Sequence, residues 1–151
     1  MKMKPQNEMK LVFPSRSANE GFARAAVAAF VSQLDPAVDE LADIRTAVSE
    51  AVTNCIVHAY PDAIGDIHLQ VRLFENGRVV VKIRDKGCGI DDIKQAMEPL
   101  FTTGGEERSG LGFSVMESFS DKLKVTSRKG KGTVVTLEKY IAARERTAKQ
   151  P

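Results

Sequence analysis

The sequence has few of the features that would place a protein in a membrane, on a nucleic acid or around a metal. Its 151 residues contain no apolar run near the roughly 20 residues that a membrane-spanning helix needs. No apolar segment follows the start, Met-Lys-Met-Lys-Pro, so we expect no signal peptide. The net charge is only +2 and the basic residues are scattered, whereas nucleic-acid-binding proteins concentrate a basic stripe. Direct nucleic-acid and membrane partners are therefore not expected.

Cysteine and histidine are also scarce, with two of each. Cys55 and Cys88 match no metal-ligand spacing, and we interpret both as small apolar residues in a reducing compartment. The composition, 42% apolar and 28% charged, is typical of a globular protein. We expect one cytoplasmic domain over residues 1–151, whose charged, alanine-rich tail from about residue 142 is frayed.

The first half of the chain predicts one strand and two helices. Residues 9–13 form a short strand candidate that Pro14 ends. Ser17 and Glu20 fit a capping box at the start of a helix that runs to about Leu34 and leaves Arg24 exposed. The predicted buried stripe of this helix is Phe22, Ala26, Val27, Phe30 and Leu34. We expect a second helix from a cap at Asp35, with Pro36 in its first turn, to about Tyr60.

Two stripes run along the second predicted helix. Its apolar stripe is Leu41, Ile44, Val48, Val52 and Cys55. Glu50, Asn54 and His58 follow one another at i, i+4 and form a polar stripe. Ala47 and Ala51 lie between the stripes and leave room for a ligand against the helix. From these residues alone, a boundary helix with chance polar neighbours is an equally good interpretation.

A β-hairpin is predicted next, and it ends in an inward-facing carboxylate. Residues 67–73 alternate apolar and polar, Asn76-Gly77 is a strong hairpin signal, and residues 79–85 form the return strand. Asp85 shares a face with Val79, Val81 and Ile83, so it should point into the core. A buried carboxylate is costly unless a protein donor or a ligand satisfies it. The glycines that follow favour a ligand.

The segment from Asp85 to Gly112 has the composition of a binding loop, because it holds six of the eleven glycines. Within it, residues 91–97 suggest a short helix and residues 99–107 an irregular stretch. A helix from Gly112 should bury Phe113, Met116 and Phe119, and free amides at its start could bind phosphate. Strands at Leu123–Val125 and Thr133–Leu137 complete an α/β two-layer sandwich, with a mostly antiparallel sheet and helices on one face.

Four short motifs now stand in a fixed order: Glu50-x-x-x-Asn54, Asp85-x-Gly87-x-Gly89, Gly110-x-Gly112 and Gly132-Thr133. Singly they are weak signals. As a set they resemble the N, G1 and G2 boxes of the GHKL superfamily, whose ATP-binding (Bergerat) fold gyrase, Hsp90, histidine kinases and MutL share. Residues 48–54, 99–103 and 107–113 are most similar to the small bacterial anti-sigma serine kinases of the sporulation, anti-sigma-F type. Between Thr103 and Arg108 the sequence is about one residue shorter than that pattern.

The resemblance implies ATP and Mg²⁺ as cofactors and a role for each matched residue. Asp85 would accept a hydrogen bond from the adenine amino group, with Thr133 in support, and Asn54 would be a Mg²⁺ ligand. Glu50 would be the catalytic base, and Arg108 would stabilise charge in the transition state. Residues 90–109 would form a lid. The remaining implied cofactor-binding residues are His58, Gly87, Gly89, Ile90, Thr102, Thr103, Ser109, Gly110, Leu111 and Gly112.

The implied function is twofold: the protein would bind a sporulation sigma factor, and with Mg-ATP it would phosphorylate a serine of an anti-anti-sigma factor. The resemblance also implies a homodimer, and Arg24 is a candidate for partner contact. Alternatives are a general-stress anti-sigma kinase or a nucleotide-gated binding module with weak catalysis. A histidine kinase would need a phosphoacceptor histidine, and only His58, in the N box, and His68, in a strand, are present. A gyrase-type machine would need a following domain, and a eukaryotic-type kinase would need an H-R-D loop.

Overall fold

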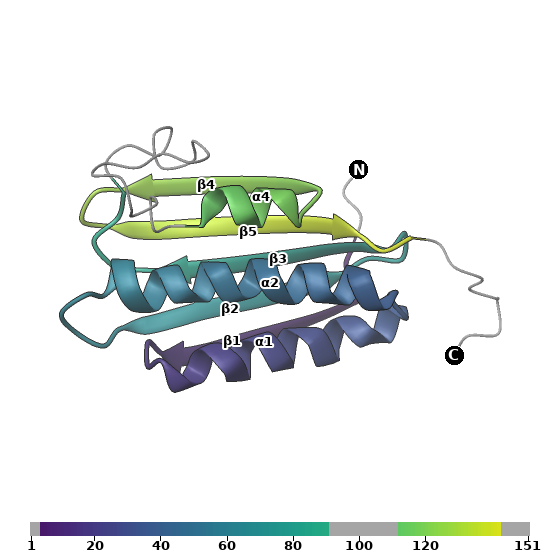
Figure 1. Ribbon diagram of the computed structural model, residues 1–151, viewed down its shortest axis with the longest axis horizontal. Helices are drawn as coiled ribbons and strands as arrows, with labels where there is room; N and C mark the ends of the chain where they lie inside the picture. The colour runs from purple at the N-terminus through teal and green to yellow at the C-terminus, as the bar shows by residue number, and fades with distance from the viewer. Residues whose placement is uncertain (1–3, 91–111, 143–151) are drawn as a thin grey trace.

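The computed structural model describes residues 4–90 and 112–142. They form two layers, an antiparallel sheet and a layer of helices on one of its faces (Figure 1). The sheet has five strands in the order β1-β2-β3-β5-β4, and every neighbouring pair is antiparallel. The elements are β1 (Asn7–Pro14), α1 (Ala18–Val31), the 3-10 helix η1 (Ser32–Leu34), α2 (Val38–Asn54), the π-helix η2 (Cys55–Ala59), β2 (Asp66–Leu73), β3 (Arg78–Asp85), α4 (Phe113–Ser118), β4 (Lys122–Arg128) and β5 (Gly132–Tyr140). The predicted fold class is confirmed.

The core lies between the sheet and the helices. Odd-numbered residues of β2 and β3 point into it, which follows from the period-two alternation of the strands. Ile67, Leu69 and Val71 are at most 1% exposed. The helices contribute Val27, Val31, Ile44, Val48 and Val52. Burying each such side chain stabilises the fold by about 1.5–3 kcal/mol. Asp85 lies in the same alternation and is 6% exposed, so its predicted inward orientation is confirmed.

The buried face of α1 differs from the predicted one. Ala23, Val27 and Val31 are fully buried, whereas Phe22 is 52% exposed. Phe22 packs edge-on against Phe13 of β1, with ring centroids 6.2 Å apart, so its ring covers the rim of the core. The predicted capping box is also wrong, because Ser17 makes no side-chain cap hydrogen bond. The Glu20 carboxylate instead accepts hydrogen bonds from Arg24 and from Ser49 of α2.

The N-cap of the second helix lies two residues later than predicted. Asp35 closes η1 in a left-handed conformation, with φ of 53°, and Ala37 is the N-cap of α2. Glu40 supports this start, since its Oε1 accepts a hydrogen bond of 2.8 Å from the Ala37 N–H. The helical stretch ends at Ala59, next to its predicted end at about Tyr60, but its last five residues form the π-helix η2.

The C-terminal elements follow the prediction. Phe113 and Met116 of α4 are buried, and Thr133, Val135 and Leu137 of β5 face the core. Phe119, the third residue predicted to be buried, follows the end of α4 and is half-buried against the core. The predicted short helix at 91–97, the irregular stretch at 99–107 and nearly all of the tail lie outside the described residues. Within the described ranges, no helix combines the length and the apolar character that crossing a membrane requires.

Candidate functional site

A cavity of about 160 Å³ opens at one end of the fold, between α2 with η2 on one side and the ends of β3 and β5 on the other. Residues from four separate parts of the chain surround it. Six of them are predicted site residues, namely Asn54, His58, Asp85, Gly89, Ile90 and Thr133. The other lining residues are Ala51, Cys55, Ala59, Ile83, Phe113 and Val135, which are mainly apolar. The cavity is therefore apolar, with a few polar groups at its wall, as small-molecule sites commonly are.

Asp85 is held by hydrogen bonds that use its two oxygens differently. Oδ1 accepts from the backbone N–H of Gly87 at 2.9 Å and of Thr133 at 3.2 Å. Oδ2 accepts only from the Cys55 thiol among described groups, at 3.5 Å. A thiol is a weak donor. The backbone thus fixes the carboxylate through Oδ1, and Oδ2 retains acceptor capacity beside the cavity.

Cys55 has a role that its sequence position did not suggest. Burial raises the pKa of its thiol, and the negative charge of Asp85 and the hydrogen bond to it raise this pKa further. The thiol therefore stays protonated and donates to Asp85. We interpreted this residue as an apolar filler because no spacing pattern marks a cysteine that pairs with an aspartate 30 positions away.

The loop after Asp85 lies against the turn between β4 and β5. Gly89 has φ of +78°, and a Cβ there would overlap the carbonyl oxygen of Arg128. The next residue is held as well, because the Ile90 N–H donates to Ser127 Oγ at 2.8 Å. Ser127 Oγ also lies 2.8 Å from Thr133 Oγ1. Ser127, which the sequence reasoning missed, links the loop to the strand that carries Thr133.

Tyr60, next to the cavity, is a third residue whose role the sequence did not indicate. Its hydroxyl donates to the carbonyl oxygen of Asp66 at 2.8 Å and accepts from the Lys86 N–H at 2.7 Å. These bonds tie the end of η2 to the beginning of β2 and to the residue after Asp85. Burial is the largest cause that raises the pKa of Tyr60, so it remains a neutral phenol and keeps both bonds.

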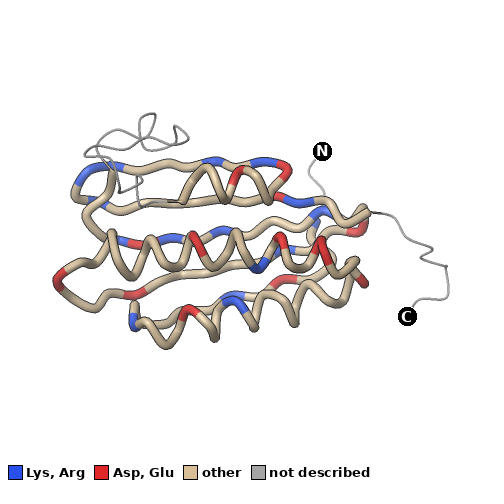
Figure 2. The backbone as a smooth tube through the Cα atoms, in the orientation of Figure 1, with Lys and Arg blue, Asp and Glu red and all other residues tan. Residues whose placement is uncertain are grey.

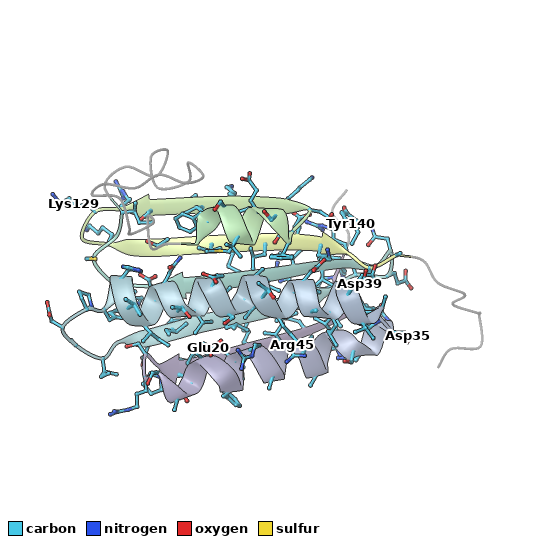
Figure 3. All side chains as sticks on the ribbon, in the orientation of Figure 1. Glu20, Asp35, Asp39, Arg45, Lys129 and Tyr140 are labelled. Carbon is cyan, nitrogen blue, oxygen red and sulfur yellow. The ribbon has the colours of Figure 1, made fainter. Side chains whose placement is uncertain are left out.

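The predicted polar stripe divides between two hollows. Asn54 and His58 line the cavity, whereas Glu50, one turn earlier, lines an open groove between α1 and α2. Arg24, Arg45 and Ser49 share that groove, and Figure 3 shows Arg45 and Glu20 between the two helices. The Glu50 carboxylate also touches the backbone at the start of α4, where a Cβ on Gly112 would overlap Glu50 Oε1. Gly112, with φ of +65°, leaves that space open.

The other predicted site residues cannot be placed. Thr102, Thr103, Arg108, Ser109, Gly110 and Leu111 lie outside the described residues, as does the predicted lid beyond Ile90. Gly87 does not line the cavity, but its N–H orients Asp85. Among described residues, no group of three or more His, Cys, Asp or Glu side chains could hold a metal ion. A cation at this site would therefore need ligands beyond such a cluster.

Comparison with known proteins places the chain in a family. Residues 13–139 match the family described as the histidine kinase-like ATPase domain. A protein of Caldanaerobacter subterraneus subsp. tengcongensis named "Anti-sigma F factor" is 54% identical over 92% of this chain and 97% of its own length. Proteins of the same name from Geobacillus kaustophilus and Clostridium beijerinckii are 55% and 54% identical over 91% and 88% of the chain, and the chain covers 94% of each.

Solved structures with lower sequence identity share the fold. The RsbU and RsbW domains of a Mycobacterium tuberculosis protein align with a TM-score of 0.66 at 18% identity, over 91% of this chain and 32% of that one. The histidine kinase domain of a blue-light-activated kinase from Erythrobacter litoralis aligns with a TM-score of 0.56 at 22% identity, over 81% of this chain and 61% of that one. The family match and the high identity to full-length relatives agree with each other. The chain therefore belongs to the histidine kinase-like ATPase domain family and, within it, to the anti-sigma F factors.

Proposed function

We propose that this protein is an ATP-dependent serine kinase that also binds a sigma factor. The observation that carries the nucleotide part is Asp85, a buried carboxylate whose Oδ2 retains acceptor capacity beside an apolar cavity. An adenine amino group is a donor of the right kind for this oxygen. Ala51, Ile83 and Val135 are apolar walls for the flat faces of the base, and Thr133 and Ile90 line the same end.

Mg²⁺ fits the donor set around Asn54. The ion prefers oxygen ligands and usually takes only one or two of them from the protein, with nucleotide phosphates and water as the rest. Asn54 lines the cavity one helical turn from Glu50 and offers a neutral amide oxygen. When bound, the ion would supply positive charge that offsets the phosphates, and His58 lines the cavity wall together with Asn54.

Glu50 is the proposed catalytic base. It lines a groove that is open to solvent, so a protein substrate could bring a serine hydroxyl to it. Glu50 would take the proton of that hydroxyl as the serine oxygen forms its bond to the γ-phosphorus. The bond between this phosphorus and the β,γ-bridging oxygen breaks, and ADP leaves. Such transfer depends mainly on positioning and electrostatics.

Several assignments concern residues that the structure does not describe, and they stay predictions. Arg108 would stabilise transition-state charge. Amides around Gly110, Leu111 and Gly112 would bind the phosphates. Thr102, Thr103 and Ser109 would contact the nucleotide from the lid. Of these residues only Gly112 is described, and it lies against Glu50, which supports a position for the phosphate loop next to the base.

The proposed protein partners follow from the family. The relatives are named anti-sigma F factors, and we extend that role to this chain: it would hold a sigma factor and block transcription. The serine substrate would be on an anti-anti-sigma factor, and two copies of the chain would form a homodimer. The groove that contains Arg24 and Glu50 is a candidate contact for the protein substrate.

The test uses γ-labelled ATP, Mg²⁺, the purified chain and the candidate anti-anti-sigma factor. Wild-type protein should transfer label to a serine of the partner, and Glu50→Gln should lower the rate about 100-fold or more, as loss of a general base does. Asp39→Asn is the matched control, because Asp39 is an exposed carboxylate in the first turn of the same helix. Binding of Mg-ATP should be nearly unchanged in both variants. Tight Mg-ATP binding without any label transfer by the wild type would overturn the kinase proposal.

A further inference from the structure

The face of the sheet opposite the helices is uncovered in the part of the chain that the structure describes. α1, α2 and α4 all lie on the other face (Figure 1). Even-numbered residues of the five strands point to the uncovered face, since the odd-numbered ones point into the core. Two shallow hollows, of about 400 and 350 Å³, are lined largely by residues of this face. The uncovered face therefore has shallow concavities that a binding partner could occupy.

Strand register places a regular row of lysines across this face. Lys10 of β1 lies beside Gln70 of β2, and Gln70 lies beside Lys82 of β3. Lys82 in turn pairs with Thr136 of β5, which pairs with Lys124 of β4. A lysine therefore stands on every second strand, with a neutral polar residue between. All three lysines are exposed. We call Lys10, Lys82 and Lys124 the lysine row.

The neighbouring rows add apolar surface and further positive charge. The row on one side contains Val12, His68, Arg84, Val134 and Thr126, and Val12 is 59% exposed. Toward the turn between β4 and β5, Arg84 lines the second hollow together with other basic side chains, Lys86, Arg128 and Lys131. Figure 2 shows basic residues gathered at this end, where Figure 3 labels Lys129. Basic residues that are scattered in the sequence are thus brought together by the fold.

The acidic groups of this face leave the lysine row uncompensated. In the row on the other side, Glu8 pairs with Arg72 at 3.0 Å. Glu138 of the same row pairs at 3.0 Å with Arg78, which lies one row further away. Asp66 lies at the start of β2, away from the row. Lys10, Lys82 and Lys124 form no ion pair with another described residue. An acidic partner would supply the missing negative charge.

Two other kinds of occupant fit this face less well. A second copy packed face to face about a two-fold axis would bring two lysine rows together, and like charges across an interface are costly. Single-stranded nucleic acid is usually held by aromatic side chains that stack on its bases. Within the lysine row and the row that contains Val12, His68 is the single aromatic ring, and no Phe, Tyr or Trp is present. Charge and chemistry therefore favour an acidic protein segment.

The spacing of the lysine row matches the spacing of side chains on an α-helix of a partner. Neighbouring strands lie about 4.8 Å apart, so lysines on alternate strands are about 10 Å apart. Carboxylates seven residues apart on an α-helix are separated by about 10.5 Å. We propose that the uncovered face docks an acidic, amphipathic helix of a partner protein, lying across the strands. Its carboxylates meet the lysine row, and its apolar side chains contact Val12 and Val134. This surface is separate from the nucleotide cavity, so the proposal stands apart from the kinase function.

The probe is a fluorescent helical peptide of about 16 residues, with glutamates at positions 1, 8 and 15 and leucines on the adjoining stripe. Its binding is measured by anisotropy at low and at physiological salt. The double variant Lys82→Gln with Lys124→Gln should bind it about tenfold more weakly. The matched control is Lys4→Gln with Arg16→Gln, which removes the same charge from exposed positions outside the strand rows and should change binding less than about twofold.

A second peptide of identical composition, with its three glutamates at adjacent positions, tests the spacing. It should bind the wild type about fivefold or more weakly than the first, because it can meet only one lysine of the row. Equal binding of both peptides, or equal effects of both double variants, would overturn the docking proposal. A short single-stranded DNA that binds more tightly than the peptide, with the same dependence on Lys82 and Lys124, would also overturn it. Loss of a dimer on Lys82→Glu, seen by sedimentation, would do so as well and identify a self-association face.

Discussion

Asp85 is the residue on which the proposed recognition of adenine depends, and its two oxygens have separate tasks. Oδ1 must accept from two backbone N–H groups, those of Gly87 and Thr133. Oδ2 receives a single weak donor, the Cys55 thiol. A carboxylate can serve both sides because all its positions accept hydrogen bonds. An amide cannot, since one of its two ends is a donor.

Asp85→Asn should therefore weaken ATP binding about 100-fold. The backbone donors hold the carbonyl oxygen at the Oδ1 position, so the NH₂ group faces the cavity and opposes the amino group of adenine. Inosine triphosphate, with an oxygen in place of that amino group, should bind the variant better than ATP does. Isothermal titration calorimetry measures both affinities, with Asp62→Asn in the exposed loop as control. If ATP binds the variant as tightly as the wild type, Asp85 does not contact the base.

The site residues that could be predicted from the sequence are those whose orientation follows from the periodicity of a strand or a helix. Asp85 could be predicted to face inward because strand alternation fixes its side. Asn54 and His58 could be placed together because i, i+4 neighbours share a helix face. Cys55 and Ser127 could not, since each acts through a contact with a residue distant in sequence. Such contacts depend on how strands and helices pack, and no local pattern records them.

Helices and strands were predicted accurately where interactions between residues close in sequence determine them. The β2–β3 hairpin was predicted well because alternation and the Asn76-Gly77 turn act within a few residues. The start of α2 was predicted wrongly because Asp35 takes a left-handed conformation and does not cap the helix. Ala37 is the N-cap instead, and its N–H donates to the Glu40 carboxylate. The π-helix η2 leaves no side-chain signature, because it changes only which backbone groups are bonded.

The contact between the loop after β3 and the β4–β5 turn can be tested with two glycines of nearly equal backbone angle. Gly89 and Gly130 have φ of +78° and +77°. A Cβ at Gly89 would overlap the Arg128 carbonyl oxygen, whereas nothing lies within 4 Å of a Cβ at Gly130. Gly130→Ala should cost about 1–2 kcal/mol, the ordinary penalty of this conformation. Gly89→Ala should cost about 2 kcal/mol more, because the loop must also move.

Urea unfolding of both variants gives the two free energies, and ATP titration gives the functional effect. Only Gly89→Ala should weaken ATP binding as well, since Ile90 and Asp85 flank this loop. Equal stabilities for the two variants would show that the loop does not need its close approach to Arg128. The comparison thus separates strain in one residue from contact between two elements.

At the scale of the whole molecule, the site joins the two layers of the fold. The helical layer contributes Asn54, Cys55 and His58, and the sheet contributes Asp85 and Thr133. The hydrogen bond from Cys55 to Asp85 is a direct polar link between these layers inside the buried region. A change that affects this pair should therefore be visible in the stability of the entire chain.

Alkaline pH is such a change. Burial raises the pKa of Cys55 well above its ordinary value of 9.0, and the charge of Asp85 raises it further. In the unfolded chain the thiol loses its proton near pH 9, whereas the folded chain keeps it. Above pH 9 the folded state therefore binds more protons, and its free energy of unfolding falls as the pH rises. The contribution of Cys55 to that slope approaches about 1.4 kcal/mol per pH unit. Below pH 9 the thiol is protonated in both states and contributes no slope.

Cys55→Ala should therefore show a shallower loss of stability than the wild type between about pH 9 and pH 11. The variant is less stable at pH 7, by about 1 kcal/mol, because it removes a buried side chain and the donor to Asp85. The two curves of unfolding free energy against pH should then converge as the pH rises. All other titratable groups are common to both proteins, so the difference between the curves isolates Cys55. Cys88 is exposed, and Cys88→Ala should leave the wild-type slope in place.

Parallel curves for Cys55→Ala and the wild type would mean that the thiol of Cys55 ionises in the folded protein as readily as in the unfolded chain. In that case the link between the layers would be no stronger than ordinary apolar packing.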